Sequence, residues 1–178
     1  MKALILNPPR RDGTVMVKEG RCMQRQGAWG YVLAPLTMVT LATMLRDDGH
    51  DPMVVDAGVD ANDFELVLER ARKFEPDVVI INTSTPTIDD DLYASRLLKE
   101  RGRGEIVTIC YGIHVSVLFA EALRPEHRVD YCVIGEPEVT IRELIAALAA
   151  GADPAQVRGL AFRPRGGELA LSTGEPGA

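Results

Sequence analysis

Five short apolar runs divide the chain, and within each run the apolar residues are largely continuous rather than alternating with polar ones. The runs cover residues 3–6, 53–55, 78–81, 106–109 and 131–134. Continuous runs rich in β-branched residues are typical of strands that are buried on both faces, as in a parallel sheet. The pattern therefore predicts five strands of a parallel sheet.

Apolar residues at helical spacing follow each of these runs. The helical stripes extend over residues 36–45, 64–71, 92–98, 115–123 and 141–148. A crossover between parallel strands needs a covering helix, and such a crossover is right-handed. The alternation predicts a doubly wound α/β domain of three layers, with a five-stranded parallel sheet in the middle.

Glycine, proline and acidic residues mark the ends of the helices. Gly49 and Gly151 follow the first and fifth stripes, where a glycine commonly ends a helix. Pro137 suits the first turn of the fifth helix, because its missing N–H is not needed there. Asp89–Asp91 opens the third helix. These carboxylates could bind a metal, but the positive end of the helix dipole accounts for them better.

Two segments lie outside the repeat of strand and helix. Residues 8–34 form a long loop after the first strand, and compact domains rarely carry such a loop without a function. Residues 159–171 read as a β-hairpin with its turn at 164–167. We therefore expect an α/β domain over residues 1–158, followed by a hairpin and linker over residues 159–178.

Composition narrows the class of protein. The 178 residues suit one globular domain, and 46% of them are hydrophobic. The net charge is −6 without a basic block, which disfavours nucleic-acid binding. No apolar run reaches the ~20 residues of a membrane span. The cysteines Cys22, Cys110 and Cys132 are far apart, which favours a reducing cytoplasm over disulfides or zinc. Cys110 and Cys132 end apolar runs and are expected to be core thiols.

Ligands of open α/β sheets bind beyond the carboxyl ends of the strands. The loops at that edge are rich in glycine and hydroxyl residues, which admit a ligand close to the backbone. Neither a G-x-G-x-x-G nor a P-loop motif is present, so dinucleotide and P-loop enzymes are disfavoured. The candidate binding residues are Asn7, Pro8, Pro9, Thr83, Ser84, Thr85, Tyr111, Gly112, His114, Gly135, Glu136 and Glu138.

The three histidines are too dispersed for a metal cluster, and we assign no residue to a metal or to catalysis. His50 precedes the second strand, at the opposite edge of the sheet, and reads as a turn residue. His114 follows the fourth strand at the candidate edge. Two interpretations of His114 stay open: it only opens the fourth helix, or it contacts a ligand.

Several motifs occur in one order along the chain. They are Asn7–Pro9, the helix from Pro35 to Gly49, Glu75–Ile80, Tyr111–His114, the acidic segment Asp130–Leu144 and Arg158–Arg163. In their order and spacing they resemble the N-terminal cobalamin-binding domain of cobalamin-dependent radical SAM enzymes. Each motif alone is weak, but together they cover nearly all of residues 1–170.

This resemblance implies a flavodoxin-like fold, with a corrinoid on the carboxyl edge of the sheet and its nucleotide tail between the loops. The classical cobalamin motif D-x-H-x-x-G, whose histidine ligates cobalt, is missing, because no histidine lies between residues 7 and 35. Its absence is common in the radical SAM branch of cobalamin-binding domains. The resemblance therefore implies a base-off, His-off cobalamin that is open for methyl transfer. Two further departures are Tyr111 in place of the first glycine of a Gly-Gly pair, and Pro137 in place of a glycine.

A radical SAM enzyme also carries a C-x-x-x-C-x-x-C cluster motif, which is absent here. We expect the iron–sulfur cluster and S-adenosylmethionine only in a downstream radical SAM domain, which would be the partner of this cofactor module. Two other interpretations remain. One is a flavodoxin-like sensing or interaction domain that binds no corrinoid, and the other is a free-standing enzyme that uses Cys22, Asp12 or His114.

Two expectations follow for the candidate site. A bulky side chain at Ser84 or Gly112 is expected to weaken cobalamin binding with little loss of fold stability. The loop over residues 10–34 is either a mobile, solvated loop or a cover for the corrinoid edge, ordered only by cofactor or partner. Its apolar and basic residues are Trp29, Tyr31, Arg10, Arg11, Lys18, Arg21 and Arg25.

Overall fold

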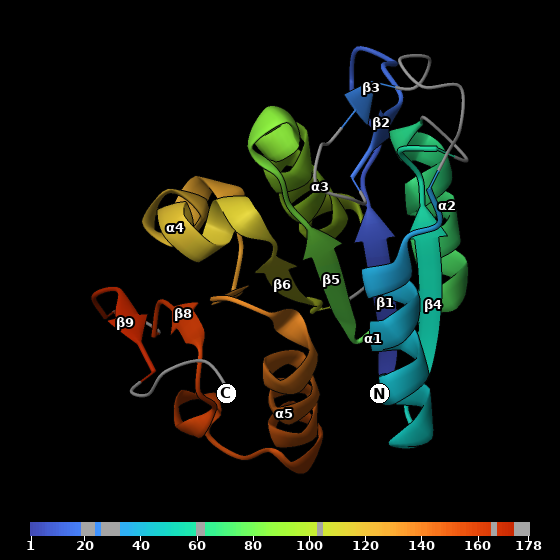
Figure 1. Cartoon of the computed structure of the whole chain (residues 1–178). Coiled ribbons are helices and arrows are strands. Elements are labelled where there is room, and N and C mark those ends of the chain that lie inside the picture. Colours follow the sequence, from blue (N-terminus) through green and yellow to red (C-terminus); the bar gives the residue numbers. More distant parts are fainter. Residues whose placement is uncertain (19–23, 26–32, 60–62, 103–104, 165–166, 173–178) are drawn as a thin grey trace.

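A computed structural model describes residues 1–18, 24–25, 33–59, 63–102, 105–164 and 167–172. Its centre is a sheet in the order β4-β1-β5-β6-β7-β8-β9 (Figure 1). The first five of these strands are parallel to one another. Their bounds are β1 (Lys2–Asn7), β4 (Asp51–Asp56), β5 (Val78–Asn82), β6 (Val107–Tyr111) and β7 (Tyr131–Val133).

The order of the parallel strands is that of a flavodoxin-like sheet, in which the first strand lies between the second and the third. In β1 the residues alternate between the two faces of the sheet: Ala3 and Ile5 join one buried cluster, and Leu4 and Leu6 join the other. Both faces of the sheet are therefore buried, as the continuous apolar runs predict. The predicted five-stranded parallel sheet and flavodoxin-like fold are confirmed.

Helices cover both faces of the sheet. Helices α1 (Leu36–Asp47) and α5 (Pro137–Ala150) pack together on the face of Ile5, in front of the sheet in Figure 1. Helices α2 (Phe64–Phe74), α3 (Ile88–Arg101) and α4 (Ile113–Ala122) cover the face of Leu4. The three predicted layers are confirmed, and each predicted stripe lies on one of these helices, apart from Leu123, which follows the end of α4.

The helix ends follow the local sequence signals. Gly49 and Gly151 have positive φ angles of 83° and 64° just after α1 and α5, where an L side chain would be strained. Pro137 is the first residue of α5, as predicted. Within the described part of the chain, three connections contain a short 3₁₀ turn: η1 (Thr85–Thr87), η2 (Pro125–His127) and η3 (Pro154–Gln156).

The predicted hairpin is formed by β8 (Leu160–Phe162) and β9 (Ala170–Leu171). It does not stand apart from the α/β domain, because β8 pairs antiparallel with β7 and continues the sheet. The Ser172 hydroxyl closes the hairpin by bonding the backbone N–H and carbonyl of Leu160. No helix among the described residues is long and apolar enough to cross a membrane.

The long connection between β1 and α1 contains a small antiparallel ribbon that the sequence pattern did not predict. Its strands are β2 (Met16–Val17) and β3 (Gln24–Arg25), and both residues of β2 are buried. Figure 1 places this ribbon beyond the carboxyl end of β1. Cys22, Trp29 and Tyr31 lie outside the described residues, so the expectation that this loop orders on binding stays a prediction.

Candidate binding site at the carboxyl edge of the sheet

A cavity of about 510 Å³ lies at the carboxyl edge of the sheet. The segments that follow β1, β5, β6 and β7 all contribute to it, together with the start of α1, as the rule for open α/β sheets predicts. Its lining residues are Lys18, Thr37, Asn82, Thr83, Ser84, Tyr111, Gly112, Ile113, Ser116, Val117, Gly135, Glu136 and Pro137. Six of the predicted residues therefore meet around one space: Thr83, Ser84, Tyr111, Gly112, Gly135 and Glu136.

A tight backbone junction between the ends of β5 and β6 forms one side of the cavity. The backbone N–H and the hydroxyl of Thr83 both donate to the carbonyl oxygen of Tyr111, at 2.7 Å each. Gly112 then turns the chain into α4 with φ +117°, and a Cβ atom there would overlap the Thr83 carbonyl oxygen. Gly112 is thus required by the turn. The expectation that a bulky side chain at Gly112 spares the fold is wrong.

Ser84 belongs to a buried hydrogen-bond network around Asp91. Its backbone N–H donates to Asp91 Oδ2 at 3.1 Å, and its hydroxyl lies 2.6 Å from that of Thr87. The Thr87 hydroxyl donates to the same carboxylate oxygen at 2.7 Å. Since Ser84 is only 1% exposed, a bulky side chain would disrupt this network as well as the cavity. For Ser84 we therefore expect a loss of fold stability as well as weaker binding, and the small loss expected from the sequence stays an untested prediction.

Lys18 is a cavity residue that the sequence analysis assigned only to the basic loop. Its ammonium group donates to Asp91 Oδ1 at 2.5 Å and to the carbonyl oxygen of Asn82 at 2.7 Å. The Lys18 side chain is 2% exposed, and that of Asp91 is fully buried. Burial raises the pKa of the Asp91 carboxyl, while the Lys18 charge and the hydrogen bonds from Thr87 and Ser84 oppose this rise.

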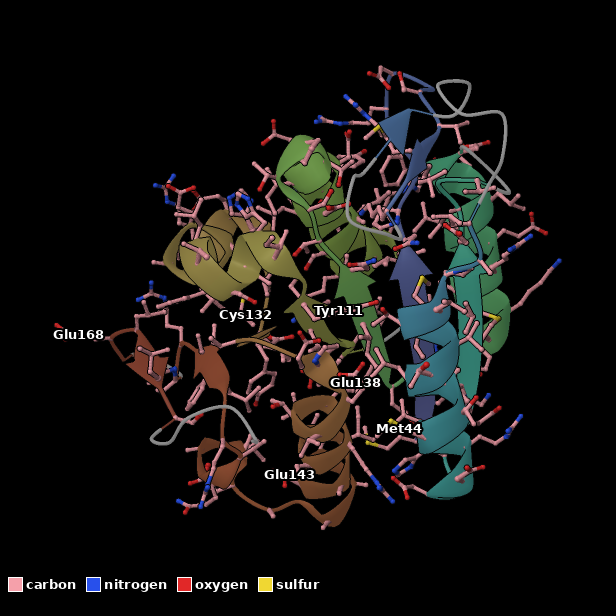
Figure 2. All side chains as sticks on the ribbon, in the orientation of Figure 1. Met44, Tyr111, Cys132, Glu138, Glu143 and Glu168 are labelled. Atoms are coloured by element: carbon pink, nitrogen blue, oxygen red, sulfur yellow. The ribbon has the colours of Figure 1, made fainter. Side chains whose placement is uncertain are left out.

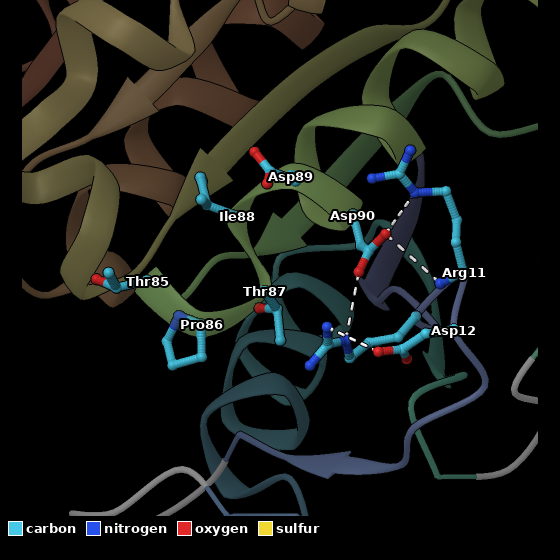
Figure 3. Close-up of a pocket in the computed structure, with 9 residues that line it drawn as sticks. Arg11, Asp12, Thr85, Pro86, Thr87, Ile88, Asp89 and Asp90 are labelled. Carbon is cyan, nitrogen blue, oxygen red and sulfur yellow. Dashed lines mark hydrogen bonds and ion pairs between the residues drawn. The ribbon is translucent and has the colours of Figure 1, made fainter.

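A second, smaller cavity of about 260 Å³ is lined by residues 10–12, η1 and the start of α3 (Figure 3). Arg10 and Arg11 both approach Asp90 there: Nε of Arg11 is 2.6 Å and Nε of Arg10 is 3.4 Å from its carboxylate oxygens. Arg10 also pairs with Asp12 at 3.0 Å. The hydrogen bond to Asp90 raises the pKa of Arg11. Both arginines therefore already pair with carboxylates of this chain.

The acidic start of α3 therefore does more than favour the helix dipole. Asp90 and Asp91 hold the segment after β1 through ion pairs with Arg10, Arg11 and Lys18. The sequence pattern alone does not connect these acids with these cations, because the partners lie more than 70 residues apart. The described residues contain no group of three or more His, Cys, Asp or Glu that could hold a metal ion.

The Asn7–Pro9 motif lies beside the cavity and does not line it. Asn7 is 3% exposed, and its side-chain amide donates to Asp56 Oδ1 at 3.0 Å. The Oδ1 atom of Asn7 is buried and has no hydrogen-bond partner among the described residues. Pro8 and Pro9 are buried. The motif therefore shapes the end of β1 and leaves one buried acceptor there.

His114, Thr85 and Glu138 also lie outside the lining of the larger cavity. His114 is the second residue of α4, so it does help to open that helix. It is 7% exposed, and its Nδ1 atom lies 3.2 Å from the Thr85 hydroxyl. Glu138 lies in the first turn of α5, next to the lining residue Pro137 (Figure 2).

Cys110 and Cys132 are buried free thiols, as predicted. They are paired in register on β6 and β7. Burial raises the pKa of Cys132 to about 12 and raises that of Cys110 well above its usual value. Thiols with such pKa values stay protonated at neutral pH, so these two residues belong to the core and not to a reactive site.

A flavodoxin-like sheet with a cavity at its carboxyl edge defines an α/β ligand-binding domain. A model of the B12 binding domain family matches residues 27–145. The chain therefore belongs to the B12 binding domain family. The resemblance seen in the sequence, to the cobalamin-binding domain of cobalamin-dependent radical SAM enzymes, agrees with this family.

Among curated proteins, the chain is 32% identical, over 92% of its length, to an anaerobic magnesium-protoporphyrin IX monomethyl ester cyclase of Synechocystis. It is 27% identical, over 93% of its length, to an uncharacterised methyltransferase of Pyrococcus horikoshii. The chain spans 31% and 33% of these two relatives, which is about a third of their length.

Two solved structures share the fold. One is the cobalamin-dependent S-adenosylmethionine radical enzyme OxsB with aqua-cobalamin and S-adenosylmethionine bound, with a TM-score of 0.76 and 14% identity over 98% of this chain. The other is the radical S-adenosylmethionine methyltransferase TsrM of Kitasatospora setae with cobalamin and a 4Fe–4S cluster bound. It has a TM-score of 0.68 and 19% identity over 99% of the chain. The chain covers 22% and 29% of these two structures.

Proposed function

We propose that this chain holds cobalamin on the carboxyl edge of its sheet, with the nucleotide tail in the 510 Å³ cavity. It would thereby serve as the cofactor module of a radical SAM enzyme, a methyltransferase or a related one. The observation that carries the proposal is the convergence of the segments after β1, β5, β6 and β7 on this cavity, within a chain of the B12 binding domain family.

The lining of the cavity suits such a tail, which combines an aromatic base with polar sugar and phosphate groups. Hydroxyl side chains contribute hydrogen-bonding groups at Thr37 and Ser116, and glycines at positions 112 and 135 leave the backbone accessible. Ile113 and Val117 contribute apolar surface. The volume lies within the ~300–1,000 Å³ that is usual for small-molecule sites.

Apolar side chains at the start of two helices would cover the flat corrin ring. Ile113 and Val117 lie one turn apart on α4 and are 67% and 72% exposed, and Leu36 at the start of α1 is 65% exposed. Burying such surface against a macrocycle removes it from water and is favourable. With the corrin bound on this surface, the same side of the domain would face a downstream radical SAM domain across the cofactor. The iron–sulfur cluster and S-adenosylmethionine are expected in that downstream domain.

We further propose that cobalamin is held base-off and His-off. His50 lies at the amino edge of the sheet, where its Nδ1 atom is 3.3 Å from the amino group of Met1. His127 lies in η2, and the His114 ring is bonded to Thr85. None of the three lines the cavity. When bound, cobalamin supplies a cobalt ion that can carry a methyl group, and this chain leaves that ion without an imidazole ligand.

Titration of the purified chain with cob(III)alamin tests this proposal. We expect saturable binding and the visible absorption spectrum of a base-off corrinoid at neutral pH. A spectrum of histidine-coordinated cobalt contradicts the His-off assignment. Absence of binding at about 1 mM cobalamin contradicts the cofactor role itself, and supports a sensing or interaction domain without corrinoid.

A further inference from the structure

Asp91 is the point at which two separate walls of the cavity are joined. Its carboxylate accepts from Lys18 in the segment after β1, and from the Ser84 N–H and the Thr87 hydroxyl in the segment after β5. Lys18 in turn donates to the carbonyl oxygen of Asn82. Lys18, Asn82 and Ser84 all line the cavity. The two walls are therefore connected through one buried ion pair.

We propose that Lys18 and Asp91 are positioning residues that set the shape of the cavity in advance of ligand binding. This inference rests on the proposed function, because cobalamin is the ligand whose affinity would depend on them. Lys18 lines the cavity, whereas Asp91 lies behind its wall and does not reach the ligand. Asp91 is fully buried and acts through Ser84 and Lys18, which form the walls.

The physical basis is the cost of burying charge. A carboxylate and an ammonium group withdrawn from water are tolerated only when each is paired and hydrogen-bonded. Every donor to Asp91 therefore has one strongly preferred position, and that preference fixes the segments which carry Lys18, Ser84 and Thr87. A cavity fixed in this way needs no ordering of its walls when the ligand enters, and this raises affinity without adding a contact.

The chain contains a matched group of residues at the opposite edge of the sheet. Lys99 lies 2.5 Å from Asp130 Oδ2, and the same carboxylate accepts from the backbone N–H and the hydroxyl of Thr108 at 2.7 and 3.1 Å. The donor types equal those at Asp91: one lysine, one backbone N–H and one threonine hydroxyl, although the Thr108 hydroxyl also lies 2.8 Å from the carbonyl oxygen of Arg128. Lys99 and Asp130 are partly exposed, and neither they nor Thr108 line the cavity.

This match permits a controlled experiment. The double variant Lys18→Met with Asp91→Asn removes both buried charges together and leaves an amide oxygen to accept from Ser84. The control is Lys99→Met with Asp130→Asn. We expect the Lys18/Asp91 double variant to bind cobalamin at least about tenfold more weakly than wild type, and the Lys99/Asp130 control to bind within about twofold of wild type. Both affinities are measured under conditions in which both variants are folded.

Hydrogen exchange supplies a second readout that needs no ligand. In the free chain, the first double variant should lose protection in residues 8–18 and 83–87 together, while the control should keep it there. If the double variant does not fold, Thr87→Val replaces it, with Thr108→Val as its control. Thr87→Val removes a single donor to Asp91, and it should also weaken cobalamin binding more than its control does.

The outcomes separate the two proposals. A wild-type chain that binds no cobalamin contradicts the proposed function, and the positioning role fails with it. A wild-type chain that binds, with equal affinity in the variants of both edges, contradicts only the positioning role. The positioning role is also contradicted if the variants of both edges lose cobalamin affinity in proportion to their loss of stability. The loss of affinity would then result from general destabilisation.

Discussion

Gly112 meets Thr83 so closely that a Cβ atom at position 112 would overlap the carbonyl oxygen of Thr83. Thr83 is held in place by two hydrogen bonds from its own N–H and hydroxyl to Tyr111. The end of β5 and the turn after β6 therefore fit each other at the backbone level. This junction supports one side of the cavity, so the cavity depends on a position where glycine is required.

Replacing Gly112 by alanine should destabilise the fold. The added Cβ meets backbone, and the φ of +117° is strained for any L side chain, so we expect a loss of about 2–4 kcal/mol in the free energy of unfolding. Gly13 is the control, because it has φ +73° but nothing within 4 Å of a Cβ atom. Gly13→Ala should cost about 1 kcal/mol. Denaturant unfolding measures both variants. Equal losses of unfolding free energy in Gly112→Ala and Gly13→Ala would show that the overlap at position 112 is relieved without cost.

Removing the Lys18 ammonium alone should be more costly than removing the Lys99 ammonium. Lys18→Met leaves the fully buried Asp91 carboxylate without its cation, for which we expect a loss of about 3–5 kcal/mol. Asp130 is partly exposed, so water replaces Lys99 and the loss should be about 1 kcal/mol. Urea unfolding of both variants measures the difference. Similar small losses would mean that Asp91 takes up a proton or reaches water when Lys18 is removed.

A charge on the exposed apolar surface of α4 should weaken cobalamin binding without unfolding the chain. Val117 is 72% exposed and lines the cavity, so Val117→Glu should change stability by no more than about 0.5 kcal/mol. It should weaken binding about tenfold, because the new carboxylate would lose water on contact with the corrinoid. Leu171→Glu is the control, since Leu171 is 57% exposed on β9 and does not line the cavity. Equal affinities of the two variants would remove Val117 from the site.

His50 should make the stability of the chain depend on pH. Burial and the nearby amino terminus lower the pKa of His50 from 6.5, so the folded state favours the neutral ring. Its contribution is present above pH 6.5 and is lost as the pH falls through the lowered pKa of the folded state. The free energy of unfolding should decrease over this window in wild type and less so in His50→Gln. Parallel pH profiles of the two proteins would assign the dependence to other groups.

The sequence predicted the parts of the fold that depend on local pattern. Runs such as residues 78–81 are apolar on both faces, and that is enough to place a strand inside a parallel sheet. The ribbon of β2 and β3 was missed, because two residues per strand carry no periodic signal. Asp130 begins the acidic segment that resembles the family motif, yet it lies at the amino edge, where its carboxylate accepts hydrogen bonds from Thr108 and Lys99.

The site was predicted to the extent that it follows the ends of strands. Tyr111 ends a strand, and Thr83 and Gly135 come within two residues after one, so topology alone brings them to one edge. Lys18 could not be assigned in the same way. Its position depends on Asp91, which is 73 residues away, and no local pattern encodes that pairing. The basic residues of the loop after β1 and the acidic residues at the start of α3 have opposite charges. Comparing these two segments with each other could have suggested that they pair.

The central claim is that the 510 Å³ cavity receives the nucleotide tail of cobalamin. The most direct test compares the affinity of the wild-type chain for cobalamin and for cobinamide, a corrinoid that lacks the nucleotide tail. Our account predicts that cobalamin binds at least about a hundredfold more tightly, because cobinamide leaves the cavity without its occupant. Equal affinity for the two corrinoids would contradict the claim, since the cavity would then contribute nothing to binding.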